Sequence, residues 1–192
     1  IATAPEPVSE LVDVVAESCR LTHNTAEAIG AAAAVAAIVS AGIDGAGFEA
    51  SLPLALAAAR EGETRARTAQ AKSISAQIEK ALARAADASG KAATVTIAQE
   101  IGTSVSAIES VPMAFAIARI SSGDPWSAAL MSTMVGDDTD TIGAISCGML
   151  GASAGLAKIE PETWRRLCDV NALDLGPIVS GLLAIRSGAR AR

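Results

Sequence analysis

Three carboxylates and two threonine hydroxyls stand together in the segment between Gly136 and Gly143, which reads Gly-Asp-Asp-Thr-Asp-Thr-Ile-Gly. A long Ala- and Gly-rich stretch with almost no charge follows directly. Carboxylates this close repel one another, so a folded site needs a cation beside them. Carboxylate and hydroxyl oxygens are hard ligands, which suit Mg²⁺, Mn²⁺ or Ca²⁺ better than zinc. The segment therefore predicts a site for a hard divalent cation.

A second interpretation of the same segment needs no metal. Asp138 and Asp140 stand at a predicted helix start, where carboxylates are stabilised by unpaired backbone N–H groups and by the helix dipole. In this alternative one Asp caps the helix and the others face solvent. Other motifs fit less well: an EF-hand loop starting at Asp138 would need Glu where Met149 stands, and the sequence has no Walker-type glycine loop.

The elements that position the segment are predicted to be helices, because apolar residues recur at helical spacing almost throughout. Asn24 is the predicted N-cap of the second helix, and Glu27 completes its capping box. Pro112 is expected to kink or split its helix, and the tail from Gly188 is expected to be disordered. The predicted helices cover residues 8–19, 24–43, 48–60, 74–85, 104–120, 125–135, 141–157, 161–170 and 177–186. The expectation is one all-α domain over residues 1–192.

Two features bear on how these helices pack. Cys147, Gly151 and Gly155 recur every four residues and predict a tight helix–helix contact along one seam. Trp126 and Trp164 are interpreted as core residues.

The composition limits the function classes. The chain is 51% hydrophobic but 2% aromatic, so Ala, Ile, Val and Leu must build its core. A net charge of −6 argues against nucleic acid as a partner. One histidine and three cysteines without a CxxC pair predict neither a zinc site nor a disulfide framework, and favour a reducing cytoplasm. The uncharged stretches 28–43 and 142–157 are shorter than the roughly 20 residues of a membrane span, so they are interpreted as core helices rather than membrane segments.

The segment from Gly136 to Ile142 resembles the C-terminal Gly-x-Asp-Thr-Asp-Thr motif of the ADP-ribosylglycohydrolase family, which includes the dinitrogenase-reductase-activating glycohydrolases. Leu21-Thr22-His23-Asn24 is similar to the Thr-His segment that opens a central helix in that family. Residues 102–105, 109–112 and 123–125 resemble further family stretches in the same order. The resemblance covers essentially the whole chain.

The resemblance implies a compact, orthogonal all-α bundle around two Mg²⁺ ions, with Mn²⁺ as a possible substitute. It implies three metal ligands in this chain, Asp138, Asp140 and Thr141. It also implies a substrate-binding role near the bound ADP-ribose for His23, Gly136 and Asp137. A buried, hydrogen-bonded histidine is the alternative for His23, and Asp137 either helps to bind metal or faces solvent.

The family's N-terminal half carries a Gly-Asp motif and a Thr-Asp-Asp segment, with the other metal ligands and an acidic catalytic residue. Nothing in residues 1–192 matches either motif, and the run 61–64 is interpreted as a solvated turn. The chain also begins with Ile1 rather than methionine. It is therefore expected to be a C-terminal portion that holds about half of the metal site, with the catalytic acid outside it and an N-terminal fragment as a possible partner.

The implied function is hydrolysis of the N- or O-glycosidic bond in an ADP-ribosylated protein or a small ADP-ribosyl or ribosyl compound, without turnover by this chain alone. The alternative is a non-catalytic module for an ADP-ribose-like ligand, or a degenerate homologue. A purely structural Ala-rich bundle, whose Asp cluster caps a helix, is the third interpretation.

Overall fold

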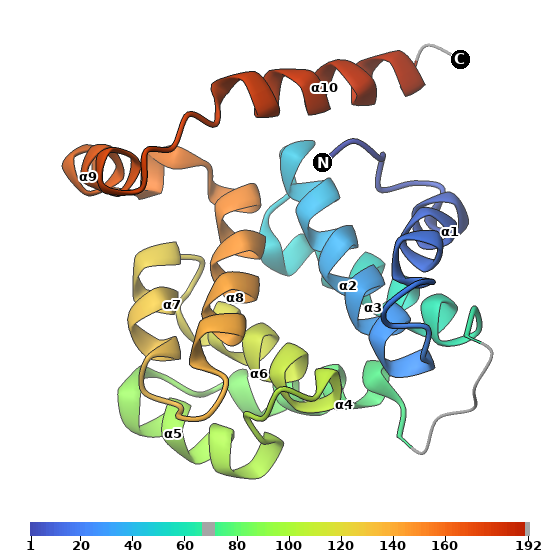
Figure 1. The fold of residues 1–192 in the computed structure, drawn as a ribbon. Helices are drawn as coiled ribbons and strands as arrows, with labels where there is room; N and C mark the ends of the chain where they lie inside the picture. Colours follow the sequence, from blue (N-terminus) through green and yellow to red (C-terminus); the bar gives the residue numbers. More distant parts are fainter. Residues whose placement is uncertain (67–71, 191–192) are drawn as a thin grey trace.

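The computed structural model describes residues 1–66 and 72–190, and all regular structure in these residues is helical. This confirms the all-α fold class. The α-helices are α1 (Val8–Cys19), α2 (Ala26–Ile43), α3 (Phe48–Glu63), α4 (Ile74–Ala85), α5 (Gly90–Ile101), α6 (Ala107–Ile120), α7 (Pro125–Ser132), α8 (Thr139–Ala154), α9 (Pro161–Asn171) and α10 (Gly176–Arg190), with a short 3₁₀ helix at Leu156–Lys158 (Figure 1).

Several helices begin at side chains that accept hydrogen bonds from their first turn. Thr25 caps α2 by accepting from the backbone N–H of Ala28 at 3.2 Å, so the predicted cap at Asn24 is wrong by one residue. Asp124 caps α7 and Glu160 caps α9 in the same way. Such caps satisfy N–H groups that have no partner inside the helix.

The core surrounds α6, whose residues from Ser110 to Ala118 are all buried. Phe115, Met113 and Ile117 are its large, fully buried side chains. The Ala-rich α2 lies against α3, α6 and α8, since small side chains let helix axes approach closely. Pro112 stays inside an unbroken α6, so of the expected kink or split, the split is wrong.

Other helix boundaries also differ from prediction. The helix α5 was not predicted; Ser89 is its N-cap and Gly90 its first residue. The chain between Gly102 and Ser106 is a loop, so the following helix begins at Ala107. Residues 188–190 belong to α10 rather than to a disordered tail, and residues 191–192 lie outside the described residues.

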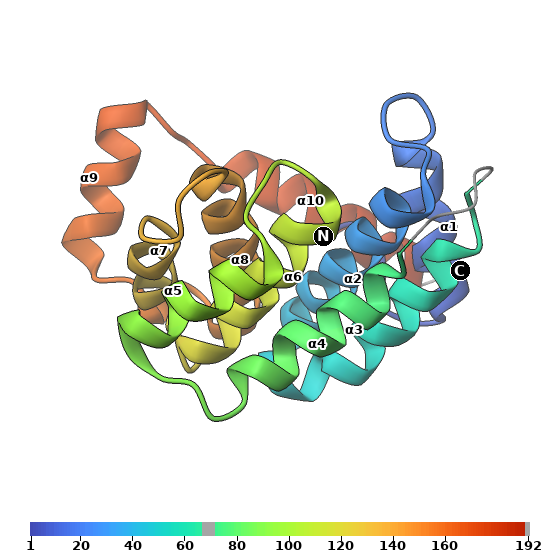
Figure 2. The ribbon, with the colours of Figure 1, turned by 90° about the horizontal axis from the view of Figure 1, so that it is seen from below.

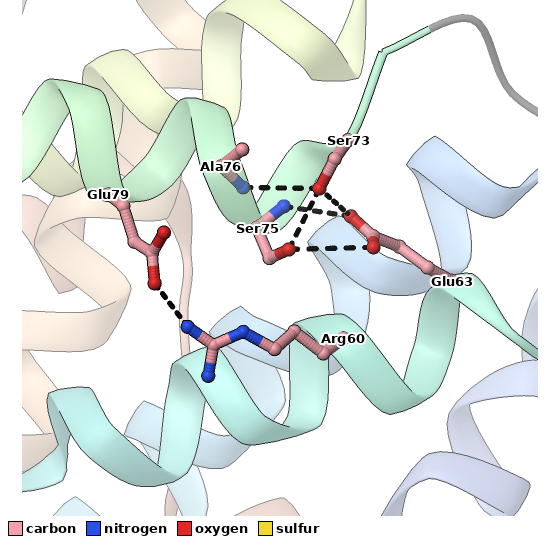
Figure 3. A network of polar contacts seen from close by, with 6 residues as sticks. All are labelled: Arg60, Glu63, Ser73, Ser75, Ala76 and Glu79. Atoms are coloured by element: carbon pink, nitrogen blue, oxygen red, sulfur yellow. Dashed lines mark hydrogen bonds and ion pairs between the residues drawn. The ribbon is translucent and has the colours of Figure 1, made fainter.

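The end of α3 and the start of α4 share a polar network, shown in Figure 3. Glu63 accepts hydrogen bonds from the Ser75 backbone N–H and from the Ser73 hydroxyl, both at 2.9 Å. Arg60 of α3 pairs with Glu79 of α4. The run 61–64 is therefore the last turn of a packed helix, with Gly62 buried, and not a solvated turn.

The small-residue seam predicted along α8 does not make the close helix–helix contact that was expected of it. An added Cβ at Gly151 or Gly155 would meet no described atom within 4 Å. The close approach is instead made by Gly42 of α2, where a Cβ would lie 2.8 Å from the carbonyl carbon of Ala152.

The C-terminal helices α9 and α10 lie outside the main bundle. Figures 1 and 2 place α9 at one edge of the molecule, on the side away from α1. Among the described residues, sixteen large apolar side chains are exposed, and nine follow α8: Leu156, Leu167, Val170, Leu173, Leu175, Ile178, Val179, Leu183 and Ile185. Trp126 and Trp164, predicted to be core residues, instead line an open cavity of about 580 Å³ between α7, α8 and α9.

By length and composition, α2 is the one single helix in the described part of the chain that is apolar enough to span a membrane. Buried residues make up 61% of it, as in a core helix. The helices α9 and α10 pass the same test only as a pair, and they are bent by 103° at the break between them.

Candidate metal centre

The acidic segment is a tight turn that ends at the first residue of α8. Gly136 and Asp137 both have positive φ angles, 78° and 57°. Asp137 is one of the residue types that tolerate this left-handed conformation. The turn leads directly into Asp138, the N-cap position of α8, and then into Asp140 in its first turn.

Asp138 and Thr141 are brought into direct contact. The Thr141 hydroxyl donates a hydrogen bond of 2.8 Å to Oδ1 of Asp138. Although Asp138 occupies the N-cap position, its carboxylate accepts no capping bond from the α8 backbone. This differs from Asp124 and Glu160, which cap α7 and α9 with their carboxylates. Asp138 therefore does not make the backbone capping bond that the purely structural interpretation would favour.

The backbone of Asp138 is held from a distant part of the chain. Its N–H donates a 2.9 Å hydrogen bond to the carbonyl of Thr103, in the loop between α5 and α6. The acidic turn and the α5–α6 loop therefore lie side by side, and Figure 2 shows the α5–α6 and α1–α2 loops projecting on the same side of the bundle. The acidic segment thus lies beside the α5–α6 loop.

The donors fit a hard divalent cation in kind but make an incomplete set. Asp137 and Asp140 are exposed and Asp138 is half-buried, so solvent and ions reach the carboxylates. Mg²⁺ accepts one or two protein carboxylates and completes its six-coordinate shell with water or substrate oxygens. Within the described residues, no three His, Cys, Asp or Glu side chains are grouped to hold a metal ion. The role of Asp138, Asp140 and the Thr141 hydroxyl as metal ligands stays a prediction.

Glu109 is a neighbour of this site that sequence reasoning did not single out. It lies in the first turn of α6, and its Oε2 accepts a 3.1 Å hydrogen bond from the Ser104 backbone N–H. Hydrogen bonds from the Ser104 side chain and backbone lower the pKa of Glu109, so the carboxylate stays ionised. Glu109 belongs to the stretch 109–112, which resembles the family. Its contact with the preceding loop could not be predicted, because such a contact leaves no periodic pattern in the sequence.

His23 lies in the loop between α1 and α2 and is exposed, so the alternative of a buried histidine is wrong. Its Nδ1 is 2.9 Å from the hydroxyl of the neighbouring Thr22. The structure shows no bond between His23 and the acidic segment in the residues it describes, and its role at a bound substrate stays a prediction.

Comparisons with known proteins identify the family. The family model described as ADP-ribosylglycohydrolase matches residues 1–190. The chain is also similar to the uncharacterized protein YegU of Escherichia coli (strain K12), with 32% identity over 180 residues. These cover 93% of this chain but 54% of YegU, so the chain spans about half the length of this relative. On the combined strength of this match and the helical fold, the chain belongs to the ADP-ribosylglycohydrolase family.

Proposed function

We propose that this chain supplies part of the metal site of a hydrolase that cleaves the glycosidic bond between ADP-ribose and its acceptor. The acceptor is a protein side chain or a small molecule. The observation that carries the proposal is the Asp138–Thr141 pair at the start of α8, in which the Asp138 carboxylate accepts the Thr141 hydroxyl and no backbone capping bond. Family membership supports hydrolysis as the activity class, and the finer assignment is our inference from this geometry.

The metals that suit these donors are Mg²⁺ ions, two in the complete site, with Mn²⁺ as an alternative. We assign Asp138, Asp140 and Thr141 as ligands, and His23, Gly136 and Asp137 to the substrate side. When bound, such ions supply Lewis acidity and a positioned water. No group of three candidate ligands occurs among the described residues, and we propose that further ligands and the catalytic acid are supplied by polypeptide beyond this chain.

A surface for such a polypeptide is available on the C-terminal helices. Nine of the sixteen exposed large apolar side chains in the described residues lie between Leu156 and Ile185, and exposed apolar side chains gathered in this way are typical of an interaction site. Nearly half of YegU lies outside the region that matches this chain. We propose that a polypeptide corresponding to that region packs against α9 and α10.

Metal binding by the chain itself is the first test of the proposal. Mn²⁺ is titrated into the purified protein while free Mn²⁺ is followed by electron paramagnetic resonance. We expect Asp138→Asn and Asp140→Asn to weaken Mn²⁺ binding at least tenfold. Asp87→Asn, which changes an exposed aspartate between α4 and α5, is the matched control and should bind as the wild type does. Equal affinity in all four proteins would refute the assignment of these ligands.

Turnover is tested with an ADP-ribosylated protein and Mg²⁺. The isolated chain is expected to release no ADP-ribose, whereas co-expression with the unmatched part of YegU should restore release. Native and denaturing mass measurements on the same sample show whether a second polypeptide accompanies the chain. Release of ADP-ribose by the pure 192-residue chain would show that the site is complete without a partner.

A second candidate function is binding of an ADP-ribose-like ligand without turnover. The incomplete group of acidic residues in the described part of the chain favours it. It predicts that ADP-ribose binds to the chain, that Asp138→Asn alters this binding, and that no complementing polypeptide produces hydrolysis. The restored release described above would exclude it.

A further inference from the structure

Glu109 holds the loop that precedes its own helix. Its Oε2 accepts the Ser104 backbone N–H at 3.1 Å, two residues before the N-cap Ser106. Gly102, with φ of 94°, lies so close that an added Cβ would be 2.4 Å from the same oxygen. The carboxylate therefore fits against the loop backbone on both sides of Thr103.

A capping box is the ordinary role for a glutamate at this position in a helix. In that arrangement, the glutamate would accept a hydrogen bond from the backbone N–H of the N-cap residue. Here the N–H of the N-cap Ser106 donates to Ser104 Oγ at 3.3 Å, and Glu109 bonds to Ser104 instead. Glu109 thus fixes the loop rather than the start of its helix.

The loop in turn holds the acidic segment. The carbonyl of Thr103, between the two residues that Glu109 contacts, accepts the Asp138 N–H at 2.9 Å. Asp138 then accepts the Thr141 hydroxyl through Oδ1 at 2.8 Å. A continuous set of short contacts therefore leads from Glu109 through the loop to the proposed metal ligands.

We propose that Glu109 is a positioning residue for the acidic segment of α8, acting through the Thr103 carbonyl on the backbone of Asp138. The inference rests on the proposed function, since it gives Glu109 a role in holding ligands of that site. Glu109 itself contacts neither metal nor substrate in this proposal. Its ionised carboxylate is the stronger acceptor for a backbone N–H.

The direct test is hydrogen exchange at the Asp138 amide. Glu109→Ala removes the acceptor and should speed exchange of this amide at least tenfold, while amides of the central helix α6 keep their wild-type rates. Glu109→Gln keeps an acceptor oxygen at the same reach and should restore most of the protection. Glu27→Ala is the matched control, because Glu27 occupies the first turn of α2.

Should Glu109→Ala fail to fold, Glu109→Asp takes its place, since it retains the charge but shortens the reach by one methylene. It should raise Asp138 exchange to an intermediate rate. Wild-type exchange at Asp138 in both Glu109→Ala and Glu109→Asp would overturn the inference. A uniform rise over all helices would also overturn it, because it would indicate a merely structural role.

Mn²⁺ affinity separates this inference from the proposed function. We expect Glu109→Ala to weaken Mn²⁺ binding about fivefold to tenfold, and Glu109→Gln to recover it. If the wild type binds no Mn²⁺ but the Asp138 amide responds as expected, the metal assignment fails and the positioning contact stands. If the wild type binds Mn²⁺ and Glu109→Ala leaves both affinity and exchange unchanged, the positioning role fails and the metal site stands.

Discussion

Gly42 of α2 lies directly against the backbone of Ala152 in α8, close enough that a Cβ would come within 2.8 Å of the Ala152 carbonyl carbon. Backbone atoms cannot move aside as a flexible side chain can. Gly42→Ala should therefore force the helices apart and destabilise the protein by about 1–3 kcal/mol, as overpacking usually does. Urea denaturation gives the change in the free energy of unfolding.

Gly148→Ala is the matched control for this prediction. Gly148 lies inside α8, is exposed, and an added Cβ there would meet no described atom within 4 Å. Alanine should stabilise the helix by roughly 0.5–1 kcal/mol relative to glycine. Stabilisation by both substitutions would show that α2 and α8 are not in tight contact.

Arg186 anchors α10 to the end of α2. Its side chain is 4% exposed, pairs with Asp44 at 2.8 Å and donates to the Ser40 carbonyl at 3.0 Å. Asp44→Ala leaves this cation buried without its carboxylate, so we expect a loss of about 3–5 kcal/mol. Arg186→Met removes the buried charge and should cost less, and adding Arg186→Met to Asp44→Ala should recover part of the loss.

The pair Arg20–Glu17 is the control for Arg186, because both its side chains are more than half exposed. Arg20→Ala should change the free energy of unfolding by about 0–1 kcal/mol. Amide exchange along α10, compared with α1, shows whether Asp44→Ala releases that helix alone. If the Asp44→Ala loss were no larger than the Arg20→Ala loss, the Asp44–Arg186 pair would not be a structural anchor.

Part of this architecture was predictable from sequence, and the limit is set by the range of the interactions. Apolar periodicity located most helices, because burial of one helix face leaves a local pattern. The acidic segment was recognisable for the same reason: its donors are consecutive. The contacts between Thr103 and Asp138, and between Arg186 and Asp44, join segments far apart in the chain, and no local pattern encodes them. The cap at Thr25 was missed because Asn24, a residue type with a stronger capping preference than Thr, stands one position earlier.

Asp124 should make stability depend on pH. The pKa of Asp124 is lowered most by the hydrogen bond from the Ser127 side chain. Hydrogen bonds from the Ser127 and Trp126 backbone N–H groups lower it further. Because the pKa of Asp124 is lower in the folded protein than in the unfolded chain, its carboxylate stabilises the fold. This stabilisation is fully present at pH values above the pKa of the unfolded chain, about 3.9 for aspartate. That stability is lost as pH falls through the folded value.

Asp124→Asn retains a capping side chain but removes the titrating group. The variant should therefore show a smaller loss of stability than the wild type as pH falls below about 4. Asp124→Ala removes the cap altogether and should cost about 1 kcal/mol at neutral pH. Urea midpoints measured from pH 7 down to pH 3 provide the comparison, and identical pH profiles for the wild type and Asp124→Asn would contradict the role of the Asp124 carboxylate.

Gly102→Ala combines two costs at the α5–α6 loop. The φ of 94° and ψ of 159° lie in a region essentially reserved for glycine, and occupying it with alanine costs roughly 1–3 kcal/mol. The new Cβ would also displace Glu109, whose Oε2 it would approach to 2.4 Å.

Gly123→Ala provides the comparison, because Gly123 has φ of 80° and an added Cβ there would meet no described atom within 4 Å. Both variants should lower the midpoint of urea denaturation, but Gly102→Ala alone should also speed exchange of the Asp138 amide. If the Asp138 amide exchanged at the same rate in the two variants, a change in the loop around Glu109 would have no effect on the acidic segment.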